Sequence, residues 1–218
     1  TMVVYIQGDN GASAEGGLNG AAFEQSMINR APESFDYTYS RLNEIGGPSL
    51  YNLYPAAWGW AMNTPFPYYK QVASQLGGIR NGMVISWPKG IAQKGEVRSQ
   101  YSFVSDIAPT ILDAAGIKPP QEIDGVSQQP IDGISLTYSF NNSKAPSKRN
   151  SQVFEMMENF GIYHNGWFAG VLPKRNPWEV YSDIGGSDLK SDQRVWQLFN
   201  LDKDFSQAAD LAKIDPAK

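Results

Sequence analysis

The sequence TMVVYIQGDNGASAEGG, residues 1–17, begins with a short apolar run and then changes abruptly to glycine and polar residues. Residues 2–6 form a continuous β-prone run, the pattern of a strand buried on both faces of a parallel sheet. Asp9 and Asn10 follow just past the carboxyl end of this run, where α/β sheets usually place their ligand sites. The stretch therefore predicts an α/β protein with a candidate site at Asp9 and Asn10.

Two later segments carry the other main elements of the predicted α/β part. MVISW, residues 83–87, is predicted as a second buried strand. SDIAPTILDAAGI, residues 105–117, predicts a helix that Ser105 or Asp106 caps and Gly116 ends.

The sequence also predicts four shorter helices, at residues 21–28, 37–45, 68–75 and 204–213. The third of these would end at Gly77 and Gly78, because glycine readily adopts the positive φ that closes a helix. The fourth would begin with Asp204 and Gln207, which have the spacing of a capping box.

A boundary is predicted in the segment 117–150, which is rich in Pro, Gly, Asn and Ser. We therefore expect an α/β part over residues 1–140 and a small antiparallel part over residues 151–218. Within the second part, Asn165-Gly166 is the favoured dipeptide of a type I′ turn between two strands.

Composition restricts the classes of function. The 218 residues, 41% of them hydrophobic, are enough for a folded core. The net charge of −4 and the pI of about 5.0, without a basic block, argue against nucleic acid or an anionic membrane as the main partner. The sequence shows neither a membrane-span pattern nor a signal peptide. It contains no cysteine and a single histidine, His164, which excludes thiolate sites and disfavours a multi-histidine zinc site.

Candidate site residues each have an ordinary alternative. Asp9 and Asn10 offer oxygen ligands that suit Ca²⁺ or Mg²⁺, but such turns also hydrogen-bond to their own backbone. Lys70 could hold a tetrahedral anion or stabilise a leaving oxygen, or it could be a solvated lysine at a helix end. Glu15 and Arg80 could also surround an anion, although Arg80 more often would bind a neighbouring carboxylate or carbonyl.

The aromatic-rich stretch YNLYPAAWGWAMNTPFPYY, residues 51–69, has two interpretations. Its rings could line a pocket for an apolar or aryl ligand, or they could pack a long loop onto the sheet. The sequence does not separate these two interpretations.

Four motifs together resemble a known family: GDNGASAEGG, NTPFPYYKQVASQLGGIRNGMVISWPKGI, SDIAPTILDAAGI and VWQLFNLDKDFSQAADLA. In that order they resemble the C-terminal half of bacterial arylsulfatases, members of the alkaline phosphatase superfamily. The likeness covers nearly all of residues 1–212. It implies part of an alkaline-phosphatase-like α/β sheet with flanking helices, followed by a small antiparallel subdomain.

The resemblance also implies a site that hydrolyses sulfate esters. Asp9 and Asn10 would supply two ligands to Ca²⁺, in preference to Mg²⁺, and Lys70 would contact the sulfate group. Metal and lysine would then share the charge of the anion. Gln75 would also face the substrate, at a position where close relatives tend to carry histidine, and an amide cannot transfer a proton as imidazole can.

The chain departs from the sulfatase pattern in one important respect. Sulfatases use a formylglycine made from the Cys of Cys-x-Pro-x-Arg, or from Ser in some members, with an upstream pair of Asp ligands, and this sequence has none of these. We therefore expect a fragment that is inactive alone and that an N-terminal sulfatase half completes, or that self-associates through an open sheet edge. Family members are often exported, which is compatible with a periplasmic location.

Two other functions stay open from the sequence. The chain could belong to a phosphonate or phosphate diester hydrolase of the same superfamily, which would use the same metal-binding end of the sheet. It could also be a non-catalytic remnant or a binding module that keeps the fold without the chemistry.

Overall fold

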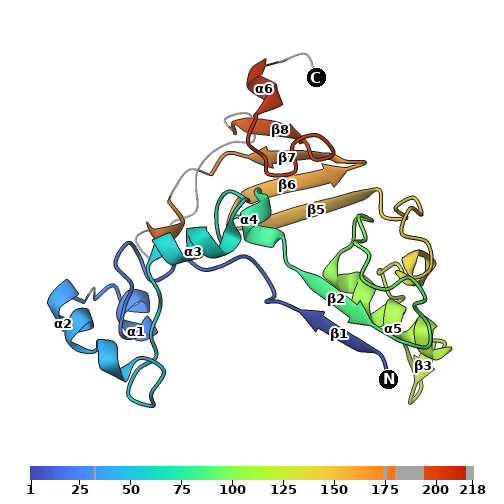
Figure 1. Ribbon diagram of the computed structural model, residues 1–218, viewed down its shortest axis with the longest axis horizontal. Helices are drawn as coiled ribbons and strands as arrows, with labels where there is room; N and C mark the ends of the chain where they lie inside the picture. The colour runs from blue at the N-terminus through green and yellow to red at the C-terminus, as the bar shows by residue number, and fades with distance from the viewer. Residues whose placement is uncertain (32, 174–175, 180–193, 215–218) are drawn as a thin grey trace. The chain divides into compact units, whose positions relative to one another are not determined.

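The computed structural model describes residues 1–31, 33–173, 176–179 and 194–214 (Figure 1). The chain forms two compact units: Thr1–Ile6 with Met83–Gln152, and Gln7–Gly82 with Val153–Lys218. The division expected from the sequence, at residues 1–140 and 151–218, stays a prediction, and part of its second range lies outside the described residues. No helix among the described residues is long and apolar enough to cross a membrane.

The first unit contains a two-stranded sheet of β1 (Val3–Ile6) and β2 (Met83–Ser86). Both strands are predicted correctly, but the expected burial in a parallel sheet is wrong. The two strands pair antiparallel, with Val3 opposite Ser86, and β1 is largely exposed. A continuous apolar run indicates a strand, but it shows neither the direction of the neighbouring strand nor what covers its faces.

The central helix of the first unit is α5 (Ile107–Ala115), and it confirms the predicted helix, although Asp106 at its N-cap position makes no side-chain cap hydrogen bond to it. A 3₁₀ turn, Val104–Asp106, leads into it, and Gly116 ends it with a φ of +70°. Beyond it lie the short hairpin strands β3 (Glu122–Ile123) and β4 (Val126–Ser127), and a 3₁₀ turn at Thr137–Ser139.

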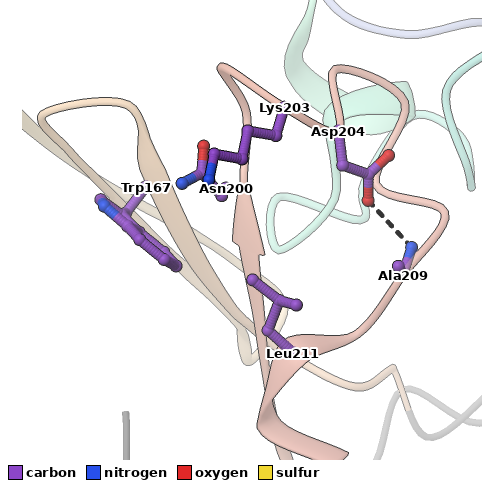
Figure 2. Close-up of a pocket in the computed structure, with 6 residues that line it drawn as sticks. All are labelled: Trp167, Asn200, Lys203, Asp204, Ala209 and Leu211. Atoms are coloured by element: carbon purple, nitrogen blue, oxygen red, sulfur yellow. Dashed lines mark hydrogen bonds between the residues drawn. The ribbon is translucent and has the colours of Figure 1, made fainter. Parts of the chain in front are cut away.

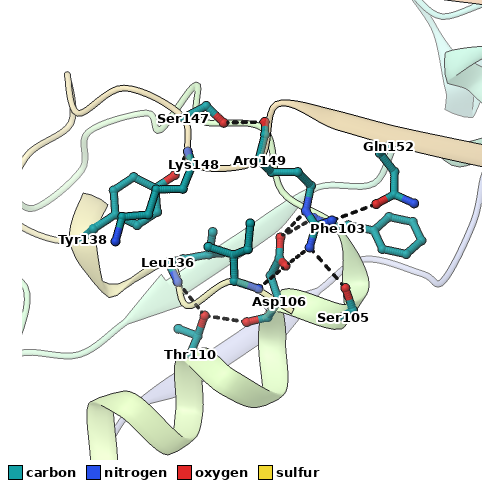
Figure 3. A network of polar contacts seen from close by, with 11 residues as sticks. Phe103, Ser105, Asp106, Thr110, Leu136, Tyr138, Ser147, Lys148, Arg149 and Gln152 are labelled. Atoms are coloured by element: carbon teal, nitrogen blue, oxygen red, sulfur yellow. Dashed lines mark hydrogen bonds and ion pairs between the residues drawn. The ribbon is translucent and has the colours of Figure 1, made fainter. Parts of the chain in front are cut away.

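Asp106 organises the first unit around the start of α5 (Figure 3). Its side chain is fully buried and accepts hydrogen bonds from the backbone N–H of Phe103 at 2.8 Å and of Ile134 at 2.7 Å. Arg149 donates to both carboxylate oxygens, with Nε at 3.1 Å from Oδ2. Three segments distant in sequence are thereby joined at one carboxylate.

The second unit begins with short helices: α1 (Glu24–Ile28), α2 (Phe35–Ser40), a 3₁₀ turn at Leu42–Glu44, α3 (Ala56–Asn63) and α4 (Leu76–Ile79). The first helix, α1, lies within the predicted region 21–28, and α2 only overlaps the predicted region 37–45, whereas α3 was not expected. The helix predicted at residues 68–75 is wrong, since these residues form turns. Gly77 and Gly78 lie inside α4 instead of ending a helix.

The second unit continues with a four-stranded sheet in the order β5-β6-β7-β8 (Figure 1). The strands are β5 (Ser151–Met156), β6 (Asn159–His164), β7 (Trp167–Val171) and β8 (Trp196–Asn200). The pairs β6–β7 and β7–β8 are antiparallel. Positive φ values at Asn165 (45°) and Gly166 (83°) match the predicted type I′ turn. The small antiparallel sheet is therefore confirmed.

The helix that ends the described chain starts later than predicted. A 3₁₀ turn at Pro177–Glu179 precedes β8, and α6 covers Leu211–Ile214. The Asp204 carboxylate accepts hydrogen bonds from the N–H groups of Ala208 and Ala209, at 3.0 and 2.8 Å. These bonds close a turn, not a capping box, because Gln207 has a φ of +57° and its side chain bonds elsewhere.

Two paired glycines of the sheet let the chain segment before α4 lie against it. Gly161 of β6 is opposite Gly170 of β7. A Cβ at Gly170 would lie 2.1 Å from the carbonyl oxygen of Ser74, and one at Gly161 would lie 2.9 Å from that of Ala73. The backbone that follows Lys70 is therefore held directly on the sheet.

Candidate functional site

Two loops of the second unit lie side by side: residues 8–17, the Asp9 loop, and residues 67–75, the Lys70 loop. The backbone N–H of Lys70 donates to the carbonyl of Ala12 at 3.0 Å, and the N–H of Gly11 donates to that of Gly78 at 3.0 Å. A Cβ at Gly11 would lie only 1.7 Å from the carbonyl oxygen of Gly77. Glycine at this position is what lets the Asp9 loop approach α4 so closely.

Asn63, at the end of α3, joins the two loops a second time. Its Oδ1 accepts the N–H of Ala12 at 2.9 Å, and its Nδ2 donates to the carbonyl of Tyr68 at 2.9 Å. Tyr68 and Gln71 both have positive φ, at 66° and 77°, a conformation that residues other than glycine rarely adopt. Such backbone is kept only where its surroundings fix it, and Asn63 provides part of that constraint.

Lys70 forms an ion pair with Glu15. Its Nζ lies 3.0 Å from Oε2 of Glu15, whose side chain is 9% exposed, while that of Lys70 is 38% exposed. The same carboxylate accepts hydrogen bonds from Nε2 of Gln71 at 2.5 Å and from Oγ of Ser13 at 3.0 Å. Lys70 is therefore held in place while part of its side chain stays accessible to solvent, unlike a fully solvated lysine at a helix end.

Asp9 and Asn10 begin the first loop, Asp9 exposed and Asn10 half-buried. Neither side chain hydrogen-bonds to another described residue, so the alternative of a turn that binds its own backbone is not observed. Within the described part of the chain, no three His, Cys, Asp or Glu residues are grouped as a metal site. Carboxylate and amide oxygens are of the class that hard cations take as ligands, and a metal-binding role of Asp9 and Asn10 stays a prediction.

Gln75 lies away from solvent, against the four-stranded sheet. It is almost completely buried, and its Nε2 donates to Oε1 of Gln197 in β8 at 2.8 Å. The next residue is held in a similar way, because Oε1 of Gln207 accepts the N–H of Leu76 at 2.7 Å. A substrate contact of Gln75 stays a prediction.

The aromatic-rich stretch 51–69 divides between packing and exposure. Tyr69 is buried, with its ring 5.9 Å from Trp60 and 6.4 Å from Trp178, centroid to centroid. Trp58 and Trp60 are more than half exposed.

Arg80 stacks its guanidinium over the ring of Phe205, at 4.4 Å from the centroid, and over that of Phe66.

A pocket of about 360 Å³ lies elsewhere in the second unit (Figure 2). Its lining residues are Trp167, Asn200, Lys203, Asp204, Ala209 and Leu211. Its lining includes none of the predicted site residues Asp9, Asn10, Lys70 and Gln75. Its carboxylate, Asp204, has a pKa below the ordinary value: burial would raise that pKa, but the N–H groups of Ala209 and Ala208 and the Ser206 hydroxyl outweigh it.

Comparison with known proteins identifies the family of this chain. The sulfatase family model matches residues 1–117, which include both loops and α5. The chain belongs to the sulfatase family. An arylsulfatase from Klebsiella aerogenes is 29% identical over 156 residues, which are 72% of this chain and 30% of that protein.

A solved sulfatase structure, PsFucS1 from Pseudoalteromonas sp., matches 96% of this chain and 32% of its own length. Its TM-score is 0.53 at 19% identity, a likeness that shows a shared fold. This member of the sulfatase family thus spans about a third of the length of the relatives it matches. The sulfatase fold agrees with the expected α/β class, although the described strands β1 and β2 pair antiparallel.

Sequence reasoning missed the residues that support Lys70. Glu15 was considered only as a neighbour of an anion, and Asn63 was not singled out. Glu15 lies 55 residues before Lys70 in the chain, and no spacing rule connects such distant positions. One local feature of the sequence could have indicated the role of Glu15: it directly precedes Gly16-Gly17, in a loop whose only other charged residue is Asp9.

Proposed function

We propose that this chain forms the metal-binding and anion-binding part of an enzyme that hydrolyses sulfate esters. In this proposal Asp9 and Asn10 ligate Ca²⁺, and Lys70 contacts the sulfate group. The observation that supports it best is the pairing of the two loops, since the backbone of Lys70 is hydrogen-bonded to Ala12, three residues after Asp9. Family membership over residues 1–117 agrees with this chemistry.

The chemistry assigns distinct tasks to the two parts of the site. A hard cation, when bound, supplies a fixed positive charge that polarises an oxygen of the ester. Asp9 and Asn10 hold and orient that cation. The Lys70 ammonium neutralises charge on the sulfate and on the leaving oxygen, which is worth most where the group is pre-positioned. Its Nζ lies 3.0 Å from Oε2 of Glu15, a contact that supports this role.

The nucleophile is proposed to come from sequence other than these 218 residues. The chain contains no cysteine and no Ser-x-Pro-x-Arg, so it offers no precursor of formylglycine. We therefore propose that the isolated chain does not turn over substrate, and that hydrolysis belongs to a gene product or complex that includes an N-terminal sulfatase half.

The test is hydrolysis of 4-nitrophenyl sulfate by the gene product that contains this chain. Lys70→Ala is expected to lower kcat/KM by about 100-fold or more, as loss of a charge-stabilising group usually does. Lys203→Ala, which changes a lysine of the separate pocket, is the matched control and should leave kcat/KM within about twofold of wild type. Equal activity of the Lys70 variant and wild type would contradict the proposal, and faster turnover of a phosphate diester would favour the alternative hydrolase.

A further inference from the structure

The Glu15 carboxylate has a more specific arrangement than an ordinary surface ion pair. Each of its oxygens is bonded: Oε1 to the Gln71 amide at 2.5 Å, and Oε2 to Lys70 and to the Ser13 hydroxyl, both at 3.0 Å. The Ser13 hydroxyl in turn accepts the backbone N–H of Glu15 at 3.0 Å. The carboxylate is thereby fixed in direction as well as position.

Buried neighbours hold the two backbones on either side of the pair. Ala14, next to Glu15, and Tyr69, next to Lys70, pack together with Ala56 in one core cluster. The N–H of Ser13 also donates to the Tyr54 hydroxyl at 2.9 Å. Glu15 and Lys70 therefore meet because both loops are anchored, and not because two long side chains happen to reach each other.

We infer that Glu15 is the positioning residue of Lys70, holding its ammonium at the place where an anionic oxygen binds. This inference rests on the proposed function of Lys70. A lysine side chain without such a partner samples many rotamers, and fixing it costs entropy at the moment of binding. A buried carboxylate that already holds the ammonium removes most of that cost before the anion arrives.

If only its charge mattered, Glu15 would weaken anion binding, whereas a positioning role predicts that it strengthens binding. A carboxylate next to the site repels sulfate, so replacing it with a neutral amide should strengthen binding if only charge matters. If Glu15 positions Lys70, the same replacement should weaken binding. The sign of the change in affinity therefore separates the two roles.

The experiment compares Glu15→Gln with wild type in the 218-residue chain, by titration with inorganic sulfate at fixed ionic strength. The side-chain ammonium signals of ¹⁵N-labelled lysine report on Lys70. We expect the sulfate Kd to rise about tenfold, the scale of a lost charge-assisted hydrogen bond, and the Lys70 signal to broaden through faster hydrogen exchange even without sulfate. Glu15→Asp, which keeps the charge, should recover part of both effects.

Glu33→Gln is the matched control. Glu33 is also a hydrogen-bonded carboxylate of this unit, accepting the N–H groups of Ala22 and Phe23 at 2.6 and 3.0 Å, and its replacement removes the same charge. It should leave the Lys70 signal and the sulfate Kd unchanged. Thermal unfolding of every variant shows whether the fold is retained.

Two outcomes would overturn the inference. One is a Glu15→Gln chain that binds sulfate as tightly as wild type, or more tightly, while Lys70→Ala binds it poorly. The other is a Lys70 ammonium signal that is as sharp in Glu15→Gln as in wild type. Failure of the proposed function would look different, because Lys70→Ala itself would then bind sulfate like wild type.

Discussion

At the scale of single residues, Asp106 shows how one carboxylate determines stability. Its burial would raise its pKa, but the Arg149 guanidinium and the N–H groups of Ile134 and Phe103 outweigh burial and hold the pKa below the ordinary 3.8. The Arg149 side chain is only 11% exposed, and Asp106→Asn removes its counter-ion. We expect it to lower the free energy of unfolding by about 3 kcal/mol at pH 7.

The pH dependence of that loss has a definite sign. Because the folded carboxylate has the lower pKa, its contribution is complete above the ordinary value near 3.8 and disappears as pH falls through the lowered pKa. Urea unfolding of wild type and Asp106→Asn should therefore converge on acidification. Asp113→Asn, at an exposed carboxylate bonded to Ser135 and Thr137, should cost much less at pH 7. A wild type that is no more stable than the Asp106 variant at neutral pH would refute this account.

At the scale of elements, the β1–β2 pair exposes an apolar face. The register places Tyr5 opposite Val84, and Val3 lies on the same face of the pair. The exposed fractions are 62% for Tyr5, 64% for Val84 and 55% for Val3. Such a face needs a cover, so we expect the isolated chain to self-associate, or to bind an N-terminal sulfatase half when one is present. Light scattering should show a mass that rises with concentration and that Val84→Glu lowers. Val97→Glu, at an exposed loop valine, is the control, and a wild-type monomer at every concentration would argue against the prediction.

The elements also show which structural features can be predicted from the sequence alone. Local signals predicted α5, with its end at Gly116, and the Asn165-Gly166 hairpin, because caps and turns depend on neighbouring residues. The helix predicted before Gly77 failed because long-range packing decides that segment: the Lys70 loop lies on the paired glycines of the sheet, and the glycines of α4 contact the Asp9 loop. Pairing between residues far apart in sequence leaves no periodic pattern.

At the scale of the whole molecule, two hydrogen-bonded loops of one unit are proposed to form a common site. The sequence predicts Asp9, Asn10 and Lys70 as its members, partly through resemblance to arylsulfatases, and these assignments stay predictions. It did not predict the Glu15 carboxylate or the Asn63 bridge, since both arise from tertiary contacts. Metal binding and anion binding should therefore be coupled in this protein.

The most direct test of the shared site is paramagnetic broadening by Mn²⁺, a hard cation that accepts the same oxygen ligands as Ca²⁺. Mn²⁺ is titrated into the ¹⁵N-lysine-labelled chain while the ammonium signals are recorded. We predict that the Lys70 signal broadens before those of Lys203 and Lys213, two lysines of the same unit, that excess Ca²⁺ reverses the effect, and that Asp9→Ala abolishes it. A Lys70 signal that stays as sharp as those of the other lysines, or one that broadens equally in Asp9→Ala, would contradict a common metal and anion site.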